Sequence, residues 1–457
     1  MKTFWNREEE QKRLRTFLAE EGGGLAVLYG RRRCGKSTLL QRVLNAGAIY
    51  YQADQREVLL QLRSLQDAMS GGLPGFERGS YSGWDDLLTA FYARVSGPVC
   101  VCLDEFPYLV QSAPELPSIL QRHVDRPDGK VKWILCGSSQ RMMQGLVLDR
   151  TAPLFGRAAV ILNLEPLFPG WIARALKLDP RDAVEAYSVW GGIPRYWELA
   201  GGYEDTESAL EDLVWGRFGV LRDEPQRLLL DDMRGGVQLY SVMSLVGAGC
   251  NRVSEIAGRL GKPMSSLMRP LAQLCELGYL RRVVPFGESP RDSKRSLYKL
   301  QDPFLRFYFR FVLPYESGLA MGMPGEARRA WRAGRVHHVA SCWEELGRTS
   351  APWLWPGQEW GPASPWWASA GGAVEFDVVA QSLDGKDLLV GECKWSEKKT
   401  AFDMAGLAAK LREKAGKIPG SRGRRIVTAF WLGGNATALG RTGHVFGPGD
   451  VMSALER

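Results

Sequence analysis

Cysteines are few in this chain of 457 residues: the eight present are scattered, with no Cys-x-x-Cys and one close pair, Cys100 and Cys102. Such scattering supports neither a disulfide framework nor a zinc site, because both need clustered sulfur ligands. Long apolar runs are absent as well, since none approaches the roughly 18 to 20 residues of a membrane helix. Residues 1–14 lack the apolar core of a signal peptide. The sequence therefore predicts a cytoplasmic protein with no membrane partner.

Acidic residues are fewer than basic ones: the sequence has 51 aspartates and glutamates and 59 lysines and arginines, a formal net charge of +8. The basic excess lies in the second half, with ten basic against four acidic residues in 252–300 and seven against one in 410–425. Stretches of this kind indicate nucleic acid as a partner, although a basic run can also be an ordinary solvated face. The length is enough for about three or four domains.

Residues 25–40 read LAVLYGRRRCGKSTLL, an apolar strand followed by a glycine-rich loop and a helical pattern. The spacing Gly30-x-x-x-x-Gly35-Lys36-Ser37 is typical of a loop that binds phosphate groups. Its backbone N–H groups and Lys36 would reach the β- and γ-phosphates, and Ser37 would offer its hydroxyl to Mg²⁺. We therefore predict ATP and Mg²⁺ as cofactors. The residues predicted to form this loop site are Gly30, Arg31, Arg32, Arg33, Cys34, Gly35, Lys36, Ser37 and Thr38.

A buried strand at 98–103 ends in the carboxylate pair Asp104 and Glu105, the Walker B pattern. Asp104 would face the hydration shell of Mg²⁺ and Glu105 the attacking water, although such a pair could instead cap the next helix. A further strand at 132–136 ends beside Ser138, where a polar sensor of the γ-phosphate sits in ring and switch ATPases. Repeated strands that end in loops at one edge predict a parallel sheet with its ligand at the carboxyl ends.

Taken together, several segments resemble the archaeal-type P-loop ATPases of the AAA+/STAND group, which also occur in bacteria. They read FWNREEE at 4–10, GRRRCGKST at 30–38, LDEFPYL at 103–109, GSS at 137–139, PLFGR at 153–157 and GGIP at 191–194. The resemblance implies that Asn6 and Arg7 approach the adenine and ribose, and that Pro194 in a helical lid closes over the base. It also implies a catalytic role for Arg157, with a homo-oligomer if that arginine acts across a subunit boundary. A surface arginine without a role is the alternative at that position.

Past residue 237, three helical patterns and a strand pair at 279–285 and 296–300 predict a winged helix-turn-helix. Leu267, Leu271 and Leu274 share the inner face of the third helix. Because proline is favoured only in a first turn, Pro270 requires that this helix starts after residue 264 or is kinked. The module is expected to contact DNA or, alternatively, another protein. Its predicted DNA-binding residues are Ser265, Ser266, Arg269, Gln273, Lys294 and Arg295.

Two strand signals near the C-terminus, at 374–380 and 388–395, are joined by a turn at 384–385. Glu392 and Lys394 are two apart and share a face, and antiparallel pairing can bring Asp377 alongside them. This Asp and Glu-x-Lys constellation resembles the PD-(D/E)xK nuclease superfamily, which occurs in the C-terminal domain of the same ATPase family. Asp377 and Glu392 would hold Mg²⁺ or Mn²⁺, and Lys394 would orient or activate the water. Glu344 would contact the metal directly or support the groups that bind it. A plain salt bridge on an exposed strand is the alternative.

The expected fold class is α/β. We expect a P-loop AAA+-like parallel sheet in residues 1–165, a helical lid in 166–235, a winged helix-turn-helix in 236–312 and a restriction-endonuclease-like domain in 313–457.

The expected function is an ATP-hydrolysing switch that binds DNA and cleaves nucleic acid. The alternative is a DNA-binding or signalling ATPase whose C-terminal domain is an inactive interaction platform. The predicted catalytic residues are Lys36, Glu105, Arg157, Asp377, Glu392 and Lys394, and the predicted metal ligands are Ser37, Asp104, Glu344, Asp377 and Glu392.

Overall fold

The structure is a computed structural model that describes residues 4–126, 129–232, 236–368, 374–439 and 443–457, without the side chains of 229–232. It divides into two compact units, Met1–Pro166 and Leu167–Arg457, and each unit is described by itself. The finer division into four domains stays a prediction. None of the helices in the described ranges is both long and apolar enough to cross a lipid bilayer.

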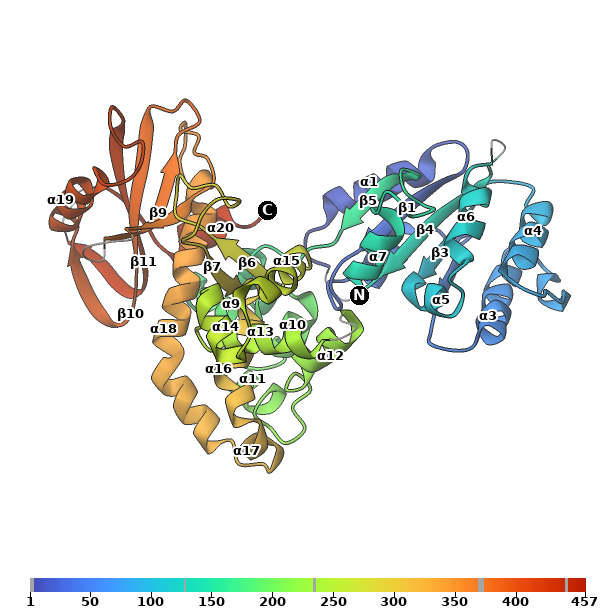
Figure 1. Cartoon of the computed structure of the whole chain (residues 1–457), viewed down its shortest axis with the longest axis horizontal. Helices are drawn as coiled ribbons and strands as arrows, with labels where there is room; N and C mark the ends of the chain where they lie inside the picture. The colour runs from blue at the N-terminus through green and yellow to red at the C-terminus, as the bar shows by residue number, and fades with distance from the viewer. Residues whose placement is uncertain (1–3, 127–128, 233–235, 369–373, 440–442) are drawn as a thin grey trace. The chain divides into compact units, whose positions relative to one another are not determined.

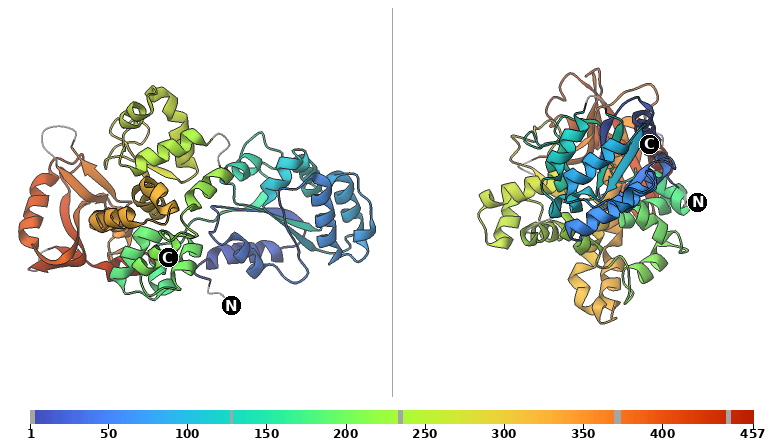
Figure 2. Two further views of the ribbon diagram at one scale, coloured as in Figure 1. Left: turned by 90° about the horizontal axis from the view of Figure 1, so that it is seen from below. Right: turned by 90° about the vertical axis from the view of Figure 1, so that its right-hand side faces the viewer.

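The first unit is built on a parallel five-stranded sheet in the order β2-β3-β4-β1-β5 (Figure 1). Its central strands β1 and β4 are almost wholly buried, as expected for a parallel sheet covered on both faces. Helices lie on both faces of this sheet (Figure 2). The strands are β1 Gly24–Tyr29, β2 Ile49–Gln52, β3 Val99–Asp104, β4 Val131–Gly137 and β5 Ala158–Asn163. The helices are α1 Glu8–Ala19, α2 Lys36–Val43, α3 Val58–Ser70, α4 Trp84–Arg94, α5 Phe106–Ser112, α6 Leu116–Val124 and α7 Gln140–Val147.

This topology confirms the predicted parallel sheet. It also brings the loops that follow β1, β3 and β4 to one edge of the sheet, because the carboxyl ends of parallel strands point the same way.

The second unit begins with a group of short helices, in the region predicted as a lid. Asp179 caps α9 by accepting hydrogen bonds from the N–H groups of Arg181 and Asp182, which satisfies donors that the first turn leaves free. The helices are α8 Trp171–Leu176, α9 Pro180–Trp190, α10 Pro194–Ala200, α11 Thr206–Leu213 and α12 Glu224–Asp232. Residues 233–235, the last of the predicted lid, lie outside the described residues.

Three helices and an antiparallel hairpin follow, in the order that the sequence predicted. They are α13 Val237–Gly247, α14 Val253–Leu260, α15 Met268–Glu276, β6 Leu280–Val283 and β7 Leu297–Leu300. A 3-10 turn at Met264–Leu267 precedes α15, so Pro270 falls in the first turn of that helix. Of the two predicted alternatives, a late start and a kink, the structure shows the late start, and Leu267, Leu271 and Leu274 are fully buried as expected.

The C-terminal part contains a mixed five-stranded sheet in the order β12-β11-β10-β9-β8. Strands β8, β9 and β10 are antiparallel, whereas β10, β11 and β12 are parallel. The long helix α18 precedes the sheet and runs beside it (Figure 1). The elements are α16 Pro303–Phe311, α17 Glu316–Ala320, α18 Gly325–Ser350, β8 Ser364–Trp367, β9 Glu375–Gln381, β10 Asp387–Asp403, α19 Met404–Ala415, β11 Arg425–Leu439, β12 His444–Phe446 and α20 Pro448–Ala454.

The loop between β6 and β7 is packed onto this sheet. Phe286 is partly buried and packs against the apolar core formed by residues such as Phe376 and Phe430. The backbone N–H of Phe286 also donates to the carbonyl oxygen of Pro365, at 2.9 Å. The hairpin and the C-terminal sheet thus share one interior.

Candidate functional site

The glycine-rich loop leaves β1 and enters α2 at Lys36. Gly30 and Gly35 both have positive φ angles, of 148° and 94°, which favour glycine. At Gly30 a Cβ atom would also lie 2.3 Å from the carbonyl oxygen of Leu164, so any larger residue would collide with the backbone. Close backbone packing therefore requires the first glycine, and the helix-entry conformation favours the second.

Lys36 is buried inside this loop, with 6% of its surface exposed. Its Nζ donates to the carbonyl oxygens of Gly30 and Arg31, at 2.8 and 3.1 Å. The ammonium group therefore lies against the loop backbone, beside the N-terminus of α2, whose free N–H groups attract anions. A phosphate oxygen entering here would meet a fixed positive charge and several donors.

The end of β3 supplies a buried carboxylate that faces the loop. Asp104 is fully buried, and its Oδ2 accepts hydrogen bonds from Ser37 Oγ at 2.7 Å and from Tyr50 Oη at 2.6 Å. Burial, with Asp104 adding to it, raises the pKa of Tyr50, so the phenol remains a donor. A hydroxyl and a carboxylate that converge in this way fit the oxygen ligands that Mg²⁺ prefers. Sequence reasoning missed Tyr50, since a tyrosine at the end of a short strand carries no recognisable signal.

Glu105 follows at a sharp turn, with a positive φ of 54°. Its carboxylate accepts hydrogen bonds from the Ser138 hydroxyl, at 2.6 and 2.8 Å, and from the Ser138 N–H at 3.2 Å. Ser138 comes directly after β4, the neighbour of β3 in the sheet. The structure therefore joins the two polar residues that the sequence predicted as base and sensor.

The N-terminal segment lies beside the same loop. Phe4 borders Gly35, and the Arg42 guanidinium lies 4.7 Å from the centre of the Phe4 ring. Asn6 Oδ1 accepts a hydrogen bond from the N–H of Arg7 at 2.7 Å. The Arg7 side chain pairs with Glu10 and donates to the carbonyl oxygen of Glu165. The predicted approach of Asn6 and Arg7 to the adenine and ribose stays a prediction.

Arg157 lies elsewhere in the first unit. It precedes β5, and Ala158 pairs with Leu25 at the start of β1, about 15 Å along the strands from the glycine-rich loop. Its guanidinium donates to the Asp125 carboxylate, at 2.8, 2.9 and 3.0 Å. Arg157 therefore does not join the loop site of its own chain, and its action on another subunit stays a prediction. Pro194 opens α10 in the second unit.

The comparisons with known proteins agree with this geometry. A model of an ATPase domain predominantly from Archaea matches residues 4–199. The uncharacterized protein MJECL04 of Methanocaldococcus jannaschii is 31% identical over 328 residues, which cover 70% of this chain and 71% of that protein. The chain belongs to this family of archaeal-type ATPases. A second model, of archaeal and bacterial proteins of unknown function, matches residues 308–404 of the ATPase.

Two solved structures extend the comparison. The Walker-type ATPase PABY2304 of Pyrococcus abyssi is 21% identical, with a TM-score of 0.50, and the match covers 67% of this ATPase and 96% of that chain. The ORC2 protein of Aeropyrum pernix is 15% identical with a TM-score of 0.44, over 73% and 98% of the two chains. The first likeness shows a shared fold.

A second cluster of charged residues lies on the C-terminal sheet of the ATPase. Val378 pairs with Gly391, which brings Asp377 alongside Glu392 on the next strand. Asp377 Oδ2 accepts a hydrogen bond from the N–H of Cys393 at 2.8 Å, and Lys394 Nζ pairs with Glu392. Burial raises the pKa of Asp377 to about 7, and repulsion by Glu392 and Glu344 contributes to this rise. Burial also raises the pKa of Glu344.

These carboxylates repel one another but do not form a complete set of metal ligands. Within the ranges that the structure describes, no group of three or more His, Cys, Asp or Glu side chains is arranged to hold a metal ion. The predicted three-carboxylate set of Glu344, Asp377 and Glu392 is therefore not assembled as such. The pair Asp377 and Glu392 still fits Mg²⁺, which commonly binds through one or two carboxylates and completes its shell with water.

Most of the residues predicted to contact DNA are accessible. Ser265 and Ser266 are exposed in the 3-10 turn before α15, and Arg269 is exposed in its first turn. Gln273 is half-buried one turn later, and Lys294 is exposed in the hairpin loop. Arg295 differs, because it pairs with Glu288 and donates to the carbonyl oxygen of Trp367 at 2.7 Å. Its guanidinium holds the loop against the C-terminal sheet and is not free to meet phosphates as predicted.

Proposed function

We propose that this ATPase binds and hydrolyses ATP at the edge of the first sheet and that the nucleotide state controls DNA binding by the second unit. The observation that carries the proposal is the convergence of Lys36, the Ser37–Asp104 pair and the Glu105–Ser138 pair at one sheet edge. Mg²⁺ held by Ser37 and Asp104 would offset the charge of the β- and γ-phosphates. Lys36 would bind the same oxygens, and Glu105 would orient the attacking water and accept its proton.

Ser138 gives this site a means of sensing its ligand. Its hydroxyl now donates to Glu105, and a γ-phosphate oxygen would be a competing acceptor for the same proton. We infer that a nucleotide with a γ-phosphate draws Ser138 away from Glu105 and frees that carboxylate to act on water. ADP, which lacks this phosphate, would leave the two residues joined.

For the three helices and the hairpin we propose DNA binding in the manner of a winged helix, with α15 in the major groove and the hairpin loop near the phosphates. Exposed Ser265, Ser266 and Arg269 on one module support this assignment, as does the basic excess of residues 252–300. The alternative is that this module contacts another protein. In that case removing its basic side chains should not change the affinity for DNA.

Charge reversal at Arg269 and Lys294 is expected to weaken duplex binding and to reduce its salt dependence. Removing one interaction with a phosphate lowers the slope of log affinity against log salt by about 0.9, so the slope of the double variant should be smaller by about 1.8. Fluorescence anisotropy with a labelled duplex at several salt concentrations measures both quantities. Arg295→Gln is the matched control, since its guanidinium is already paired with Glu288 and should leave the slope unchanged. An unaltered affinity in the double variant would favour protein contact.

For the C-terminal sheet we propose metal-dependent cleavage of nucleic acid by Asp377, Glu392 and Lys394. The two carboxylates would hold Mg²⁺, which activates water and binds the scissile phosphate, and Lys394 would orient the attacking water. The raised pKa of Asp377 supports a cation-binding site, because a bound cation relieves the repulsion between neighbouring carboxylates and so stabilises their ionised forms. An inactive interaction platform is the second candidate, favoured by the absence of a three-ligand group among the described residues.

Mg²⁺ is expected to raise the melting temperature of the wild-type protein, and Asp377→Asn should remove this response. Without metal at pH 8 the same variant should be more stable than the wild type. The folded-state pKa of about 7 lies above the ordinary 3.8, so ionisation of Asp377 above pH 7 opposes folding.

Lys394→Ala should keep the metal response but lose cleavage of plasmid and single-stranded DNA. Asp384→Asn, in the exposed turn between the same strands, is the control. A wild-type protein that neither responds to Mg²⁺ or Mn²⁺ nor cuts DNA would establish the platform.

A further inference from the structure

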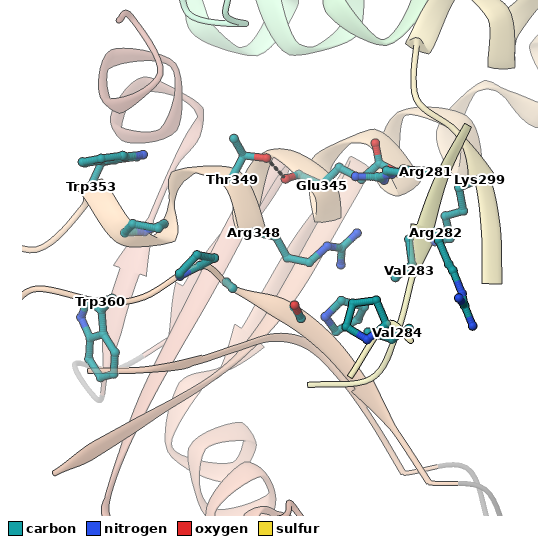
Figure 3. Close-up of a pocket in the computed structure, with 16 residues that line it drawn as sticks. Arg281, Arg282, Val283, Val284, Lys299, Glu345, Arg348, Thr349, Trp353 and Trp360 are labelled. Carbon is teal, nitrogen blue, oxygen red and sulfur yellow. Dashed lines mark hydrogen bonds and ion pairs between the residues drawn. The ribbon is translucent and has the colours of Figure 1, made fainter. Parts of the chain in front are cut away.

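A cavity of about 620 Å³ lies between the β6–β7 hairpin, the end of α18 and the segment 360–365. We call it the junction cavity. Arg281 and Lys299 from the hairpin and Arg348 from α18 border it on one side, and Trp353 and Trp360 border it on the other (Figure 3). Arg348 extends from the helix toward its centre (Figure 3). The volume falls within the range of about 300 to 1,000 Å³ that is typical of small-molecule sites.

The cations of this cavity outnumber the carboxylates that pair with them. Arg281 and Lys299 are direct partners across the hairpin, an arrangement that destabilises a strand pair when both charges have the same sign. Arg281 pairs with Glu345, but Glu345 also pairs with Arg306 at 2.6 Å. Neither Lys299 nor Arg348 has a carboxylate within ion-pair distance among the described residues.

The excess of positive charge affects the ionisation of Lys299. Burial lowers its pKa against the attraction of Glu345, and Arg348 and Arg281 lower it further. No described residue forms a hydrogen bond with its ammonium group. Positive charges that are partly buried beside one another repel and oppose folding, so an anion that entered the cavity would stabilise this cluster.

Phosphate is the anion that these groups match best. Arginine binds phosphate oxygens through a planar fork of donors, and a lysine adds a compact charge. Arg348 also connects the cavity with the second charged cluster, because its Nη1 donates to the carbonyl oxygen of Asp377 at 2.8 Å. The tryptophan wall opposite the cations provides apolar surface for the rest of a phosphorylated molecule.

We propose that the junction cavity binds a phosphate group carried by a nucleotide or by a nucleic-acid strand, with Lys299 and Arg348 as its cationic partners. This inference goes beyond the proposed function, since it requires neither ATP hydrolysis nor cleavage. It also assigns a ligand to residues on the hairpin and on α18, outside the sequence motifs described above.

The test uses the full chain carrying Lys36→Ala, so that the glycine-rich loop no longer contributes to phosphate binding. Fluorescent ADP and a labelled single-stranded oligonucleotide are the probes, and inorganic phosphate is the competitor. Lys299→Met and Arg348→Gln should each weaken binding roughly 10- to 100-fold, as expected for the loss of a hydrogen bond to a charged group. Lys386→Met and Arg329→Gln remove the same charges from exposed positions and should change little. Weakened ADP binding identifies a nucleotide as the ligand, and weakened oligonucleotide binding alone identifies a strand.

Thermal unfolding separates a ligand site from a structural role. Lys299→Met should raise the melting temperature without ligand, because it removes a partly buried charge that Arg281 and Arg348 repel, whereas loss of a structural lysine would lower it. Phosphate should raise the melting temperature of the Lys36→Ala parent but not that of its Lys299→Met derivative. Arg348→Gln also removes the hydrogen bond to Asp377, so Lys299→Met decides the outcome if the arginine variant fails to fold. Equal binding of both probes by the parent and Lys299→Met, or no binding by either, would overturn the proposal.

Discussion

Glu105→Gln is expected to bind ATP as the wild type does and to hydrolyse it about 10²- to 10⁴-fold more slowly, the usual effect of losing a general base. The amide keeps the size of the side chain and can still accept a hydrogen bond from Ser138, so the turn after β3 should be preserved. It cannot take a proton from water, and the chemical step therefore fails while binding persists. Phosphate release and fluorescent-nucleotide binding, measured on the same sample, separate the two effects.

Two further variants make the result specific. Lys36→Ala should lose nucleotide binding itself, since the buried ammonium group is the cation that the loop surrounds. Glu115→Gln removes an equivalent carboxylate from an exposed position at the start of α6 and should leave both properties unchanged. Undiminished hydrolysis by the Glu105→Gln protein would show that another group activates the water.

Glu345→Ala is expected to destabilise the second unit by about 3 to 5 kcal/mol, the cost of removing one member of a buried ion pair. The Glu345 carboxylate lies between Arg281 and Arg306, which come from the hairpin and from α16. Without it, the Arg306 guanidinium and the half-buried Arg281 guanidinium would face each other and the Arg348 and Lys299 charges nearby. Urea unfolding of the full chain measures the change, with exposed Glu326→Ala on the same helix as control.

The same carboxylate predicts a dependence on pH. Burial alone would raise the pKa of Glu345, but Arg281, Arg306 and Arg348 lower it to about 2. In the unfolded chain the group takes up a proton near its ordinary pKa of 4.5. Its contribution to stability is therefore complete above about pH 4.5 and is lost as the pH falls toward 2. A Glu345→Ala protein with an unchanged unfolding free energy, or with the same acid dependence as the wild type, would contradict this account.

The phosphate-binding part of the molecule was predictable because its signals are local. A strand, two glycines and a lysine within one short segment specify both the turn and the chemistry, so the positions of Gly30, Gly35 and Lys36 followed from spacing. The grouping of Asp377 on one strand with Glu392 and Lys394 on the next was predictable for the same reason, since side chains two apart on a strand share a face. Pro270 likewise limited the third helix to a late start or a kink, and the structure has the late start.

What the sequence could not give depends on pairings between distant segments. Tyr50 reaches Asp104, Arg157 meets Asp125 and Arg295 is captured by Glu288 only once the strands and loops are in register. In the sequence, an arginine near a motif looks like a catalytic or phosphate-binding group. Whether a distant carboxylate pairs with it is decided only by the fold. The opposition of Arg281 and Lys299 also arises from hairpin register, which the long loop between the strands does not specify.

The shared interior of the hairpin and the C-terminal sheet has a consequence for how this chain can be recombined in evolution. Phe286 packs, partly buried, against the core of the sheet, and Arg295 donates to the carbonyl oxygen of Trp367. A gene fusion that took the C-terminal segment alone would uncover apolar surface of the sheet, and one that took the helices and hairpin alone would expose an aromatic ring. Natural exchange should therefore transfer both segments together, and in relatives that lack the sheet the residue that aligns with Phe286 should be polar.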